Sequence, residues 1–340
     1  MRRGGIALYR LRMKERSADP IMTVEPWTDS IRSDEPEQDR RTHGLLSRFV
    51  GSLSATGLAR CGNLLGELAY RSDRRHRIIV QHNLKFAFPA WEEHRIAEVS
   101  RRVFHNIGRT LTEMVQCTQM SRSAIYARCQ LKGEEHFQRA LEAGRGIILV
   151  SAHLGNWEIG LQYLACHFGK RVHLVVRPLV PRRLDRWVNH ARTRFGNHLI
   201  SKKQAFPKML KAIRGNGIVA LMADLSSRKQ SVPVTYFGRR ARTSPAAALL
   251  AARCRAPVIA AFTTRNPDGS FSIEIPPPIL IQRSGNLKDD LRCNSQRITD
   301  IVETAVRNHP DQYLWLQKRW KEYYPHLYPG YRPRPIPPED

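Results

Sequence analysis

A histidine and a glutamate follow a short apolar run in the middle of the chain. The run is Ile147 to Val150, and the two side chains are His153 and Glu158 of the stretch HLGNWE. A neutral imidazole can take the proton from a hydroxyl that attacks a carbonyl, and a carboxylate on the other ring nitrogen fixes the tautomer. The pair therefore predicts general-base catalysis with a hydroxyl of the acceptor as nucleophile. The chain has no G-x-S-x-G sequence, which argues against a covalent hydrolase.

The spacing of the two side chains requires a break in the backbone. In one unbroken helix, residues five apart point about 140° from each other. We expect His153 at the end of a strand, Gly155 in a conformation that other residues avoid, and Glu158 in the first turn of a helix. Such crevices are where open α/β sheets bind ligands. Judged by spacing alone, a packing role for His153 is slightly favoured over a catalytic one, because 13 histidines and 30 acidic residues produce such pairs by chance.

The hydrophobic pattern indicates which elements position this turn. After Lys132, short β-branched runs alternate with helical stretches, which predicts an α/β fold with helices on both faces of a sheet. The sequence RNPDGS at residues 265–270 predicts a hairpin, so we expect a mixed, mainly parallel sheet. A long helix is expected over residues 287–308. The expected strands are residues 146–151, 172–176, 217–224, 233–237 and 257–264.

The first third of the chain is predicted to be helical. Residues 44–70 carry leucines at helical spacing, which fits either an amphipathic helix on a membrane or a core-facing helix. Their longest uncharged run, residues 49–59, is shorter than the roughly 20 residues that a spanning helix needs. A second helix is expected over residues 92–117. One face of that helix should carry Ile96, Val99, Val103, Ile107 and Leu111.

Length and composition describe a folded protein with anionic partners. The chain has 340 residues, 41% of them hydrophobic, and a formal net charge of +26. A membrane face, a phosphorylated lipid, an acidic carrier protein or nucleic acid would all suit this charge. The six cysteines show no metal-ligand spacing, so we expect reduced thiols and no metal, and no secretory signal pattern is seen at the N-terminus. The expected organisation is a mobile charged segment at 1–42, a helical portion at 43–131, an α/β domain at 132–325 and a proline-rich surface tail at 326–340.

Several other motifs surround HLGNWE in a fixed order. They are NLKFAFP at residues 83–89, VVRP at 175–178, GIVALMAD at 217–224, YFGRRARTS at 236–244 and HPDQYLWLQKRWK at 309–321. Together they resemble the bacterial lipid A biosynthesis acyltransferases, the late lauroyl and myristoyl transferases, over residues 44–321. The chain departs from many relatives at Leu225, where they have a polar residue, and at Gln317, where they have a histidine.

The resemblance implies a glycerolipid acyltransferase-like fold and an O-acyltransferase activity. His153 and Glu158 would form the catalytic dyad, with His153 taking the proton from a hydroxyl that attacks an acyl carrier protein thioester. The acyl chain would be carried on phosphopantetheine, with no bound cofactor. The acceptor would be a lipid A precursor or related membrane lipid, and the enzyme would act at the cytoplasmic face of the bacterial inner membrane, held there by its N-terminal helical portion.

The resemblance also points to residues that bind substrate. Arg177 and Asp224 would line the crevice beside His153, with Asn156 in the turn itself. Arg177 suits a lipid phosphate, although it could be a solvated arginine, and Asp224 could be a simple strand-end cap.

Two basic stretches suggest further binding sites. Gly238 and Arg239 lie in YFGRRARTS ahead of an expected helix, which favours a phosphate site or a solvated basic turn. In QYLWLQKRWK, Trp315 and Arg319 are four apart, which predicts a helix face anchored in the core or at the membrane interface, with Lys318 and Lys321 turned toward headgroups or carrier.

Two alternatives stay open. The same family chemistry could use acyl-coenzyme A as donor and a lysophospholipid or glycolipid as acceptor. The charge alone would also suit a nucleic-acid-binding protein, but the chain shows no helix-turn-helix, single-strand-binding or zinc-module signature, so we expect no nucleic acid partner.

Overall fold

The central element is a five-stranded sheet whose strands all run parallel. The computed structural model describes residues 50, 52–179, 181–228 and 230–332. The strand order is β4-β3-β5-β2-β8, and because every pairing is parallel, the carboxyl ends of all five strands meet at one edge. This confirms the predicted α/β core. The five strands are β2 (Ile147–Ser151), β3 (Val172–Val176), β4 (His198–Ser201), β5 (Ile218–Met222) and β8 (Val258–Ala260).

The expected single mixed sheet is instead three sheets. The predicted strand at residues 257–264 breaks at Ala261, whose N–H donates to the Val150 carbonyl, and the chain beyond it leaves the parallel sheet. That second half pairs with the predicted hairpin partner, and a further strand joins them in a three-stranded sheet. A two-stranded hairpin forms the third sheet. These strands are β1 (Cys129–Lys132), β9 (Phe262–Arg265), β10 (Phe271–Glu274), β6 (Val232–Tyr236) and β7 (Arg239–Thr243).

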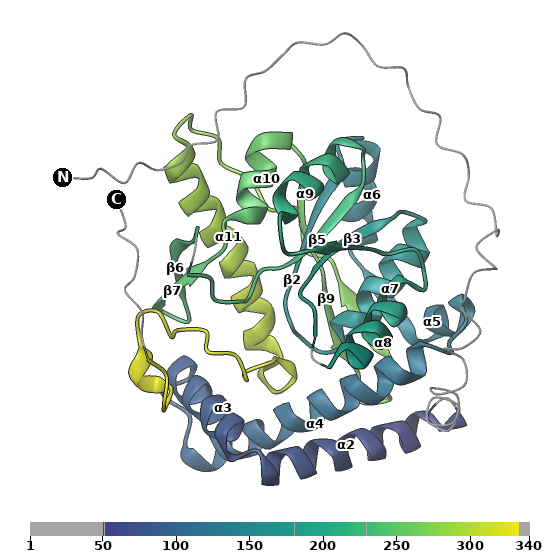
Figure 1. Cartoon of the computed structure of the whole chain (residues 1–340), viewed down its shortest axis with the longest axis vertical. Helices are drawn as coiled ribbons and strands as arrows, with labels where there is room; N and C mark the ends of the chain where they lie inside the picture. The colour runs from purple at the N-terminus through teal and green to yellow at the C-terminus, as the bar shows by residue number, and fades with distance from the viewer. Residues whose placement is uncertain (1–49, 51, 180, 229, 333–340) are drawn as a thin grey trace. The chain divides into compact units, whose positions relative to one another are not determined.

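Helices cover both faces of the parallel sheet (Figure 1). Successive residues of β2 point to opposite faces: Ile148 and Val150 enter one core, and Ile147 and Leu149 enter the other. On the first face lie α9 (Ala205–Arg214), α10 (Ala246–Cys254) and α11 (Leu287–Asn308), and on the second lie α6 (Glu134–Glu142) and α7 (Trp157–Phe168). Strands buried on both faces explain why β2 is a continuous apolar run.

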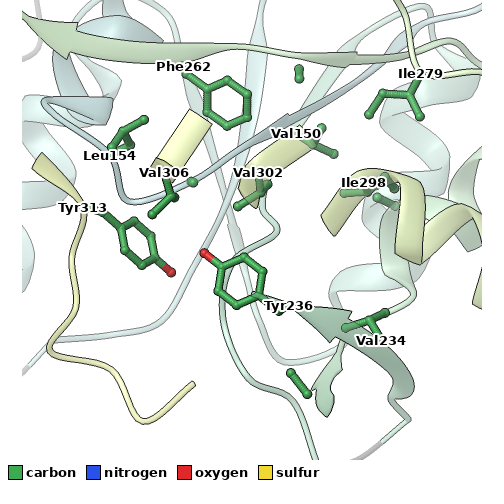
Figure 2. Close-up of a cluster of buried hydrophobic side chains, with 14 of the residues drawn as sticks. Val150, Leu154, Val234, Tyr236, Phe262, Ile279, Ile298, Val302, Val306 and Tyr313 are labelled. Atoms are coloured by element: carbon green, nitrogen blue, oxygen red, sulfur yellow. The ribbon is translucent and has the colours of Figure 1, made fainter. Parts of the chain in front are cut away.

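The first core extends beyond the sheet to the hairpin and the last part of the chain. Figure 2 shows Val302 and Val306 of α11 near Val150 of β2, and Tyr236 and Tyr313 with their hydroxyl groups facing each other. Tyr236 ends β6, whereas Tyr313 follows the 3₁₀ turn η1 (Pro310–Gln312). Segments far apart in the sequence therefore share one core.

The N-terminal helices pack against each other through glycines. Helix α2 (Ala55–Ser72) lies along α4 (Glu93–Cys117) in Figure 1. A Cβ on Gly66 would lie 2.4 Å from the Phe104 carbonyl oxygen, and one on Gly108 would lie 2.1 Å from the Gly62 carbonyl oxygen, so only glycines allow this approach. Leu58 of α2 is buried, but the three later leucines of the helix are left exposed. Leu64, Leu65 and Leu68 are 62%, 48% and 55% exposed.

No helix within the described part of the chain is long and apolar enough to cross a membrane. The first residues of the predicted amphipathic segment, 44–49, lie outside the described residues, as does the predicted charged segment at 1–42. The other helices are α3 (Arg74–Ala87), α5 (Arg122–Arg128) and α8 (Arg182–Thr193).

The predicted apolar face of α4 is wrong in its second half. Ile96, Val99 and Val103 are buried as expected, but Leu111 is 53% exposed. The buried stripe continues through polar residues, Asn106, Thr110 and Glu113. Helix α4 therefore turns a polar surface toward the protein interior over its C-terminal half.

The helix predicted for QYLWLQKRWK is not formed, but its predicted anchoring in the core is confirmed. Residues 313–324 form successive turns, and Trp315, Arg319 and Trp320 are all buried. The predicted surface tail is anchored at its start, because Tyr328 is buried and its hydroxyl donates to Asn83 Oδ1 at 2.8 Å. A second 3₁₀ turn, η2 (Pro325–Leu327), leads into it, and residues 333–340 lie outside the described part.

Candidate active site

The residues between β2 and α7 form a sharp turn that we call the catalytic turn, residues 151–158. Gly155 has φ +57°, and a Cβ there would lie 2.0 Å from the Thr263 carbonyl oxygen. Asn156 then caps α7, because its side-chain oxygen accepts from the Ile159 N–H at 3.1 Å. The predicted break at Gly155 and Asn156 is present. His153 lies beyond the carboxyl end of β2, and Glu158 lies in the first turn of α7.

The His153 ring is held by Asp224, which follows β5, the neighbour of β2 in the sheet. Both Asp224 carboxylate oxygens lie 3.0 Å from His153 Nδ1, and the His153 backbone N–H also donates to one of them at 3.2 Å. A carboxylate can only accept, so Nδ1 carries the proton and Nε2 of the neutral ring is left as the base. Asp224 is fully enclosed, and no residue in the described ranges hydrogen-bonds Nε2.

The electrostatics of this pair favour a charged histidine. Burial opposes the imidazolium, but the charge and hydrogen bond of Asp224 outweigh it and raise the pKa of His153 above its ordinary value of 6.5. Burial also opposes the Asp224 carboxylate, while His153 acts the other way and lowers the pKa of Asp224. Asp224 therefore stays ionised at neutral pH and stabilises the proton that His153 would accept.

Glu158 does not contact the imidazole, contrary to the simplest interpretation of the sequence. Its carboxylate accepts hydrogen bonds from two nitrogens of Arg192 of α8: Nη2 lies 2.5 Å from Oε1, and Nε lies 3.2 Å from Oε1 and 3.0 Å from Oε2. The Trp157 indole N–H donates to the same carboxylate at 3.1 Å. The carboxylate on the ring nitrogen is Asp224, so the predicted strand-end cap is the partner of His153. Glu158 acts on His153 at longer range, where its charge helps to raise the pKa of the imidazole.

The segment after η1 supports both members of the His153–Asp224 pair. The Leu314 N–H donates to the His153 carbonyl at 2.9 Å, and Gln317 Nε2 donates to Asp224 Oδ2 at 3.1 Å. The same Gln317 nitrogen donates to the Tyr313 hydroxyl at 2.6 Å. Gln317 thus occupies a hydrogen-bonding position beside the Asp224 carboxylate.

Two cations lie at the same edge of the sheet as His153. Arg177 follows β3, and Lys202 follows β4 with its N–H donating to the Val176 carbonyl at 3.0 Å. Both side chains are exposed. Burial and the nearby Arg177 charge lower the pKa of Lys202. Since β3 neighbours β5, Arg177 and Asp224 follow adjacent strands. That Arg177 lines a substrate crevice stays a prediction.

The remaining predicted binding residues lie elsewhere. Gly238, with φ +68°, sits in the exposed turn between β6 and β7. Arg239 begins β7, stacks on Phe86, and lines a cavity of about 230 Å³ together with His82 and Lys85 of α3. Residues 239–243 form strand β7 and lead into α10, so the helix expected after this stretch is present. The phosphate site proposed at Gly238 and Arg239 stays a prediction.

Two arginines of the predicted sites are buried in the core. Arg242 donates to the side chain and carbonyl of Ser231, at 2.8 and 2.9 Å. Arg319 donates to the Arg242 carbonyl at 2.7 Å and stacks over Tyr236. The Arg319 guanidinium thus joins the hairpin to the C-terminal segment. The role of Arg319 in binding substrate stays a prediction.

The geometry places a histidine, a buried carboxylate on its Nδ1 and two exposed cations at the carboxyl edge of a parallel sheet. Residues 45–322 match the model of the bacterial lipid A biosynthesis acyltransferase family. The chain belongs to this family. It is therefore an enzyme of the acyltransferase class, and the His153 turn lies inside the matched region.

Individual relatives agree with this membership. A lipid A biosynthesis acyltransferase of Haemophilus influenzae is 25% identical over 246 residues, 72% of this chain and 75% of that protein. The lipid A biosynthesis lauroyltransferase of Escherichia coli is 28% identical over 266 residues, covering 77% and 83%. A phosphatidylinositol mannoside acyltransferase of Mycolicibacterium smegmatis is 25% identical over 190 residues, covering 55% and 60%.

Sequence reasoning missed Arg192 and the buried residues behind the catalytic turn. Arg192 lies on α8 within a run of basic residues that resembles a solvated surface, and only the fold brings it to Glu158. A usable signal existed in α4, where Asn106, Thr110 and Glu113 continue the three-and-four spacing of the buried apolar residues.

Proposed function

We propose that this acyltransferase moves a fatty acyl chain from an acyl carrier protein thioester to a hydroxyl of a lipid A precursor or related membrane lipid. The observation that carries the mechanism is the His153–Asp224 contact. It fixes the proton on Nδ1 and leaves Nε2 as a base at the edge where parallel sheets bind ligands. The lipid acceptor is supported by the named activities of the relatives.

The reaction follows from this arrangement. His153 Nε2 takes the proton from the acceptor hydroxyl as its oxygen attacks the thioester carbonyl. Asp224, accepting from Nδ1, stabilises the imidazolium that forms. The carbon–sulfur bond then breaks, the carrier thiolate leaves, and the imidazolium returns its proton to the sulfur. The acyl group is already activated as a thioester, so no further co-reactant is needed.

Glu158 has a different part in this proposal from the one that the sequence suggests. Paired with Arg192, it joins the start of α7 to the end of α8 on one side of the turn. Its charge also favours the imidazolium. We therefore propose that Glu158 assists His153 through position and charge, without a hydrogen bond to the ring.

The surface beside the site suits an anionic, membrane-bound substrate. Arg177 and Lys202 offer positive charge next to the strand that carries Asp224. The exposed leucines of α2 form an apolar face, Leu64, Leu65 and Leu68, that fits contact with the cytoplasmic face of the bacterial inner membrane. A basic chain of net charge +26 is attracted both to anionic lipid and to an acidic carrier protein.

Replacing His153 with Ala tests the proposal most directly. We expect acyl transfer from carrier thioester to lipid acceptor to fall by about 10³-fold or more, because the base is lost. Purified protein would be assayed with acyl carrier protein and with acyl-coenzyme A as donors, and the product identified by mass spectrometry. Thermal melting checks that the fold is retained.

The matched control is His167→Ala, which removes a histidine from the same helix α7 that pairs with Glu134 instead. It should retain full activity. Full activity in His153→Ala would overturn the mechanism. If acyl transfer occurred only from acyl-coenzyme A, then acyl-coenzyme A rather than the carrier protein would be the donor.

A further inference from the structure

One buried side chain links the catalytic turn to helix α4. Asn156 is 1% exposed and uses both ends of its amide. The oxygen accepts from the Ile159 N–H and starts α7, and Nδ2 donates to Glu113 Oε2 at 2.7 Å. The direction in which α7 leaves the turn, and with it the place of Glu158, therefore depends on where Glu113 holds this amide.

Glu113 is itself fixed by a buried arginine. Arg265, at the end of β9, donates from Nε to Glu113 Oε1 at 2.6 Å and from Nη2 to Oε2 at 2.5 Å. Both side chains are only 5% exposed. Such a two-pronged pair fixes orientation as well as distance, and it is costly to break because either charge alone would be left buried.

The same cluster holds the backbone of the turn. The Thr110 hydroxyl donates to the Gly155 carbonyl at 3.1 Å, and the Gly155 N–H donates to the Gln312 carbonyl at 2.9 Å. Asn106 Nδ2 donates to that same Gln312 carbonyl at 2.8 Å, and the Asn106 side-chain oxygen accepts from Arg265. Gln312 in turn exchanges two hydrogen bonds with the Arg265 backbone, at 2.8 and 3.0 Å.

We propose that the buried pair Glu113–Arg265 positions the catalytic turn by holding Asn156, so that His153 and Glu158 face their partners in the reactive geometry. The inference rests on the proposed function. It assigns no contact with substrate: Glu113 and Arg265 act through Asn156. The geometry points to this role because the pair touches the helix cap that starts α7, while its neighbours clamp the residue just before that cap.

A buried ion pair could simply stabilise the fold, and the hydrogen-bond pattern offers a way to separate the two roles. In Asn156→Asp, the carboxylate still caps α7, but its other oxygen faces the Glu113 carboxylate, so two acceptors and two like charges meet. In Glu113→Gln, the single side-chain oxygen left at position 113 cannot accept all three hydrogen bonds that Glu113 accepts from Asn156 Nδ2 and from Arg265 Nε and Nη2. The double variant reverses donor and acceptor. The amide introduced at position 113 would donate to the carboxylate introduced at position 156 and accept from Arg265, and the cluster keeps its net charge.

The experiment measures kcat and KM for donor and acceptor in the full chain. Because small displacements of a reacting group cost up to about 100-fold in rate, we expect each single variant to lower kcat by about 10- to 100-fold with KM within twofold. The double variant should recover at least about tenfold over either single variant. Additive loss in the double variant, or a change confined to KM, would overturn the proposal.

The matched control is Asn294→Asp on α11. Asn294 is also 1% exposed, and its Nδ2 donates to the Gln282 carbonyl at 2.9 Å, so the substitution again sets acceptor against acceptor away from the site. It should lower the melting temperature as Asn156→Asp does, yet leave kcat within twofold. An equal loss of kcat in this control would reduce the Glu113–Arg265 pair to a structural role.

A second measurement does not depend on activity. Hydrogen exchange in the peptide spanning residues 153–160 should quicken in both single variants, return toward wild type in the double variant, and stay unchanged in Asn294→Asp. If the wild-type protein transfers no acyl chain, the proposed function fails, and this exchange pattern still decides whether the pair holds the turn. Unchanged exchange in both single variants contradicts the inference.

Discussion

Two tight turns contain residues that the sequence predicts to be functional, but they differ in how far the rest of the protein encloses them. The catalytic turn and the β6–β7 turn each follow a strand and contain a glycine with positive φ, Gly155 and Gly238. A Cβ on Gly155 would meet the Thr263 carbonyl, whereas a Cβ on Gly238 would meet nothing within 4 Å. The first turn is enclosed by polar groups from distant segments, and the second is exposed.

The difference shows what distinguishes a reactive turn from a basic one. An exposed arginine near a turn, such as Arg239, is solvated by water and needs no buried partner for its charge. In the proposed mechanism, His153 accepts a proton in a defined direction, which requires its ring, its backbone and the following helix to be fixed. Each of these is bonded to a different part of the chain. Enclosure, rather than residue type, separates the two turns.

Among substitutions that affect the catalytic turn, Asp224→Asn should cause the largest loss of activity. An amide can donate to Nδ1 and favour the wrong tautomer, so we expect kcat to fall by about 10³- to 10⁴-fold. The pH profile of kcat/KM provides the second readout. In the wild type, His153 must be neutral, so activity should rise with pH through a pKa above 6.5. Without the Asp224 charge that pKa falls, and the residual activity should rise at lower pH.

A wild-type profile whose rising limb lies below pH 6.5 would contradict the assignment of Asp224 as the partner of His153. Gln317→Ala serves as a graded comparison, because it removes one neutral donor from Asp224 and leaves the carboxylate in place. Because the carboxylate charge is kept, its profile should stay close to the wild-type position.

Alanine at each glycine compares the two turns directly. Gly155→Ala combines a left-handed backbone with a clash against backbone, so we expect a loss of more than about 2 kcal/mol in unfolding free energy and about 100-fold in activity. Gly238→Ala meets only the backbone penalty of about 1 kcal/mol. Chemical denaturation and initial rates measure both. Equal losses of activity in the two variants would mean that the β6–β7 turn belongs to the site.

Alanine substitution of the exposed arginines should have the smallest effects on activity. Arg177→Ala at the sheet edge should raise KM for the lipid acceptor by about tenfold, the contribution of one charged contact of about 1.4 kcal/mol. Arg239→Ala in the cavity beside Phe86 should raise KM for the lipid acceptor by less than about threefold. Arg253→Ala on α10 is the control, because it removes the same charge from another surface. A larger effect of Arg239 than of Arg177 would move the lipid-binding surface to the hairpin.

The parallel strands could be predicted because burial on both faces demands continuous β-branched runs, as in β2 and β5. The break at Gly155 and Asn156 could also be predicted, because five residues cannot be bridged on one helix. The partner of His153 could not be derived from spacing, since 71 residues separate it from Asp224 and strand order places β5 beside β2. Strand order depends on packing between helices, which local sequence does not encode.

The Glu113–Arg265 pair escaped prediction for a different reason. Charged residues are usually solvated, so a glutamate on a helix and an arginine before a turn give no sign of burial. The helical periodicity of α4 did contain the information, but following apolar residues alone led to Ile107 and Leu111 and away from the buried stripe. The apolar pattern identified the helix correctly and misjudged which way it faces.

The hydrogen bonds from residues 312–317 to the catalytic turn impose an order on biosynthesis. The histidine, the aspartate and the helix cap are all translated long before Gln312, Leu314 and Gln317, which fix them in place. A nascent chain that stops after α11 contains every reactive group of the proposed mechanism and still lacks the contacts that align them. The site is therefore aligned only after residues 312–317 have been synthesised, well after its reactive groups, which delays acyl transfer until that segment has folded.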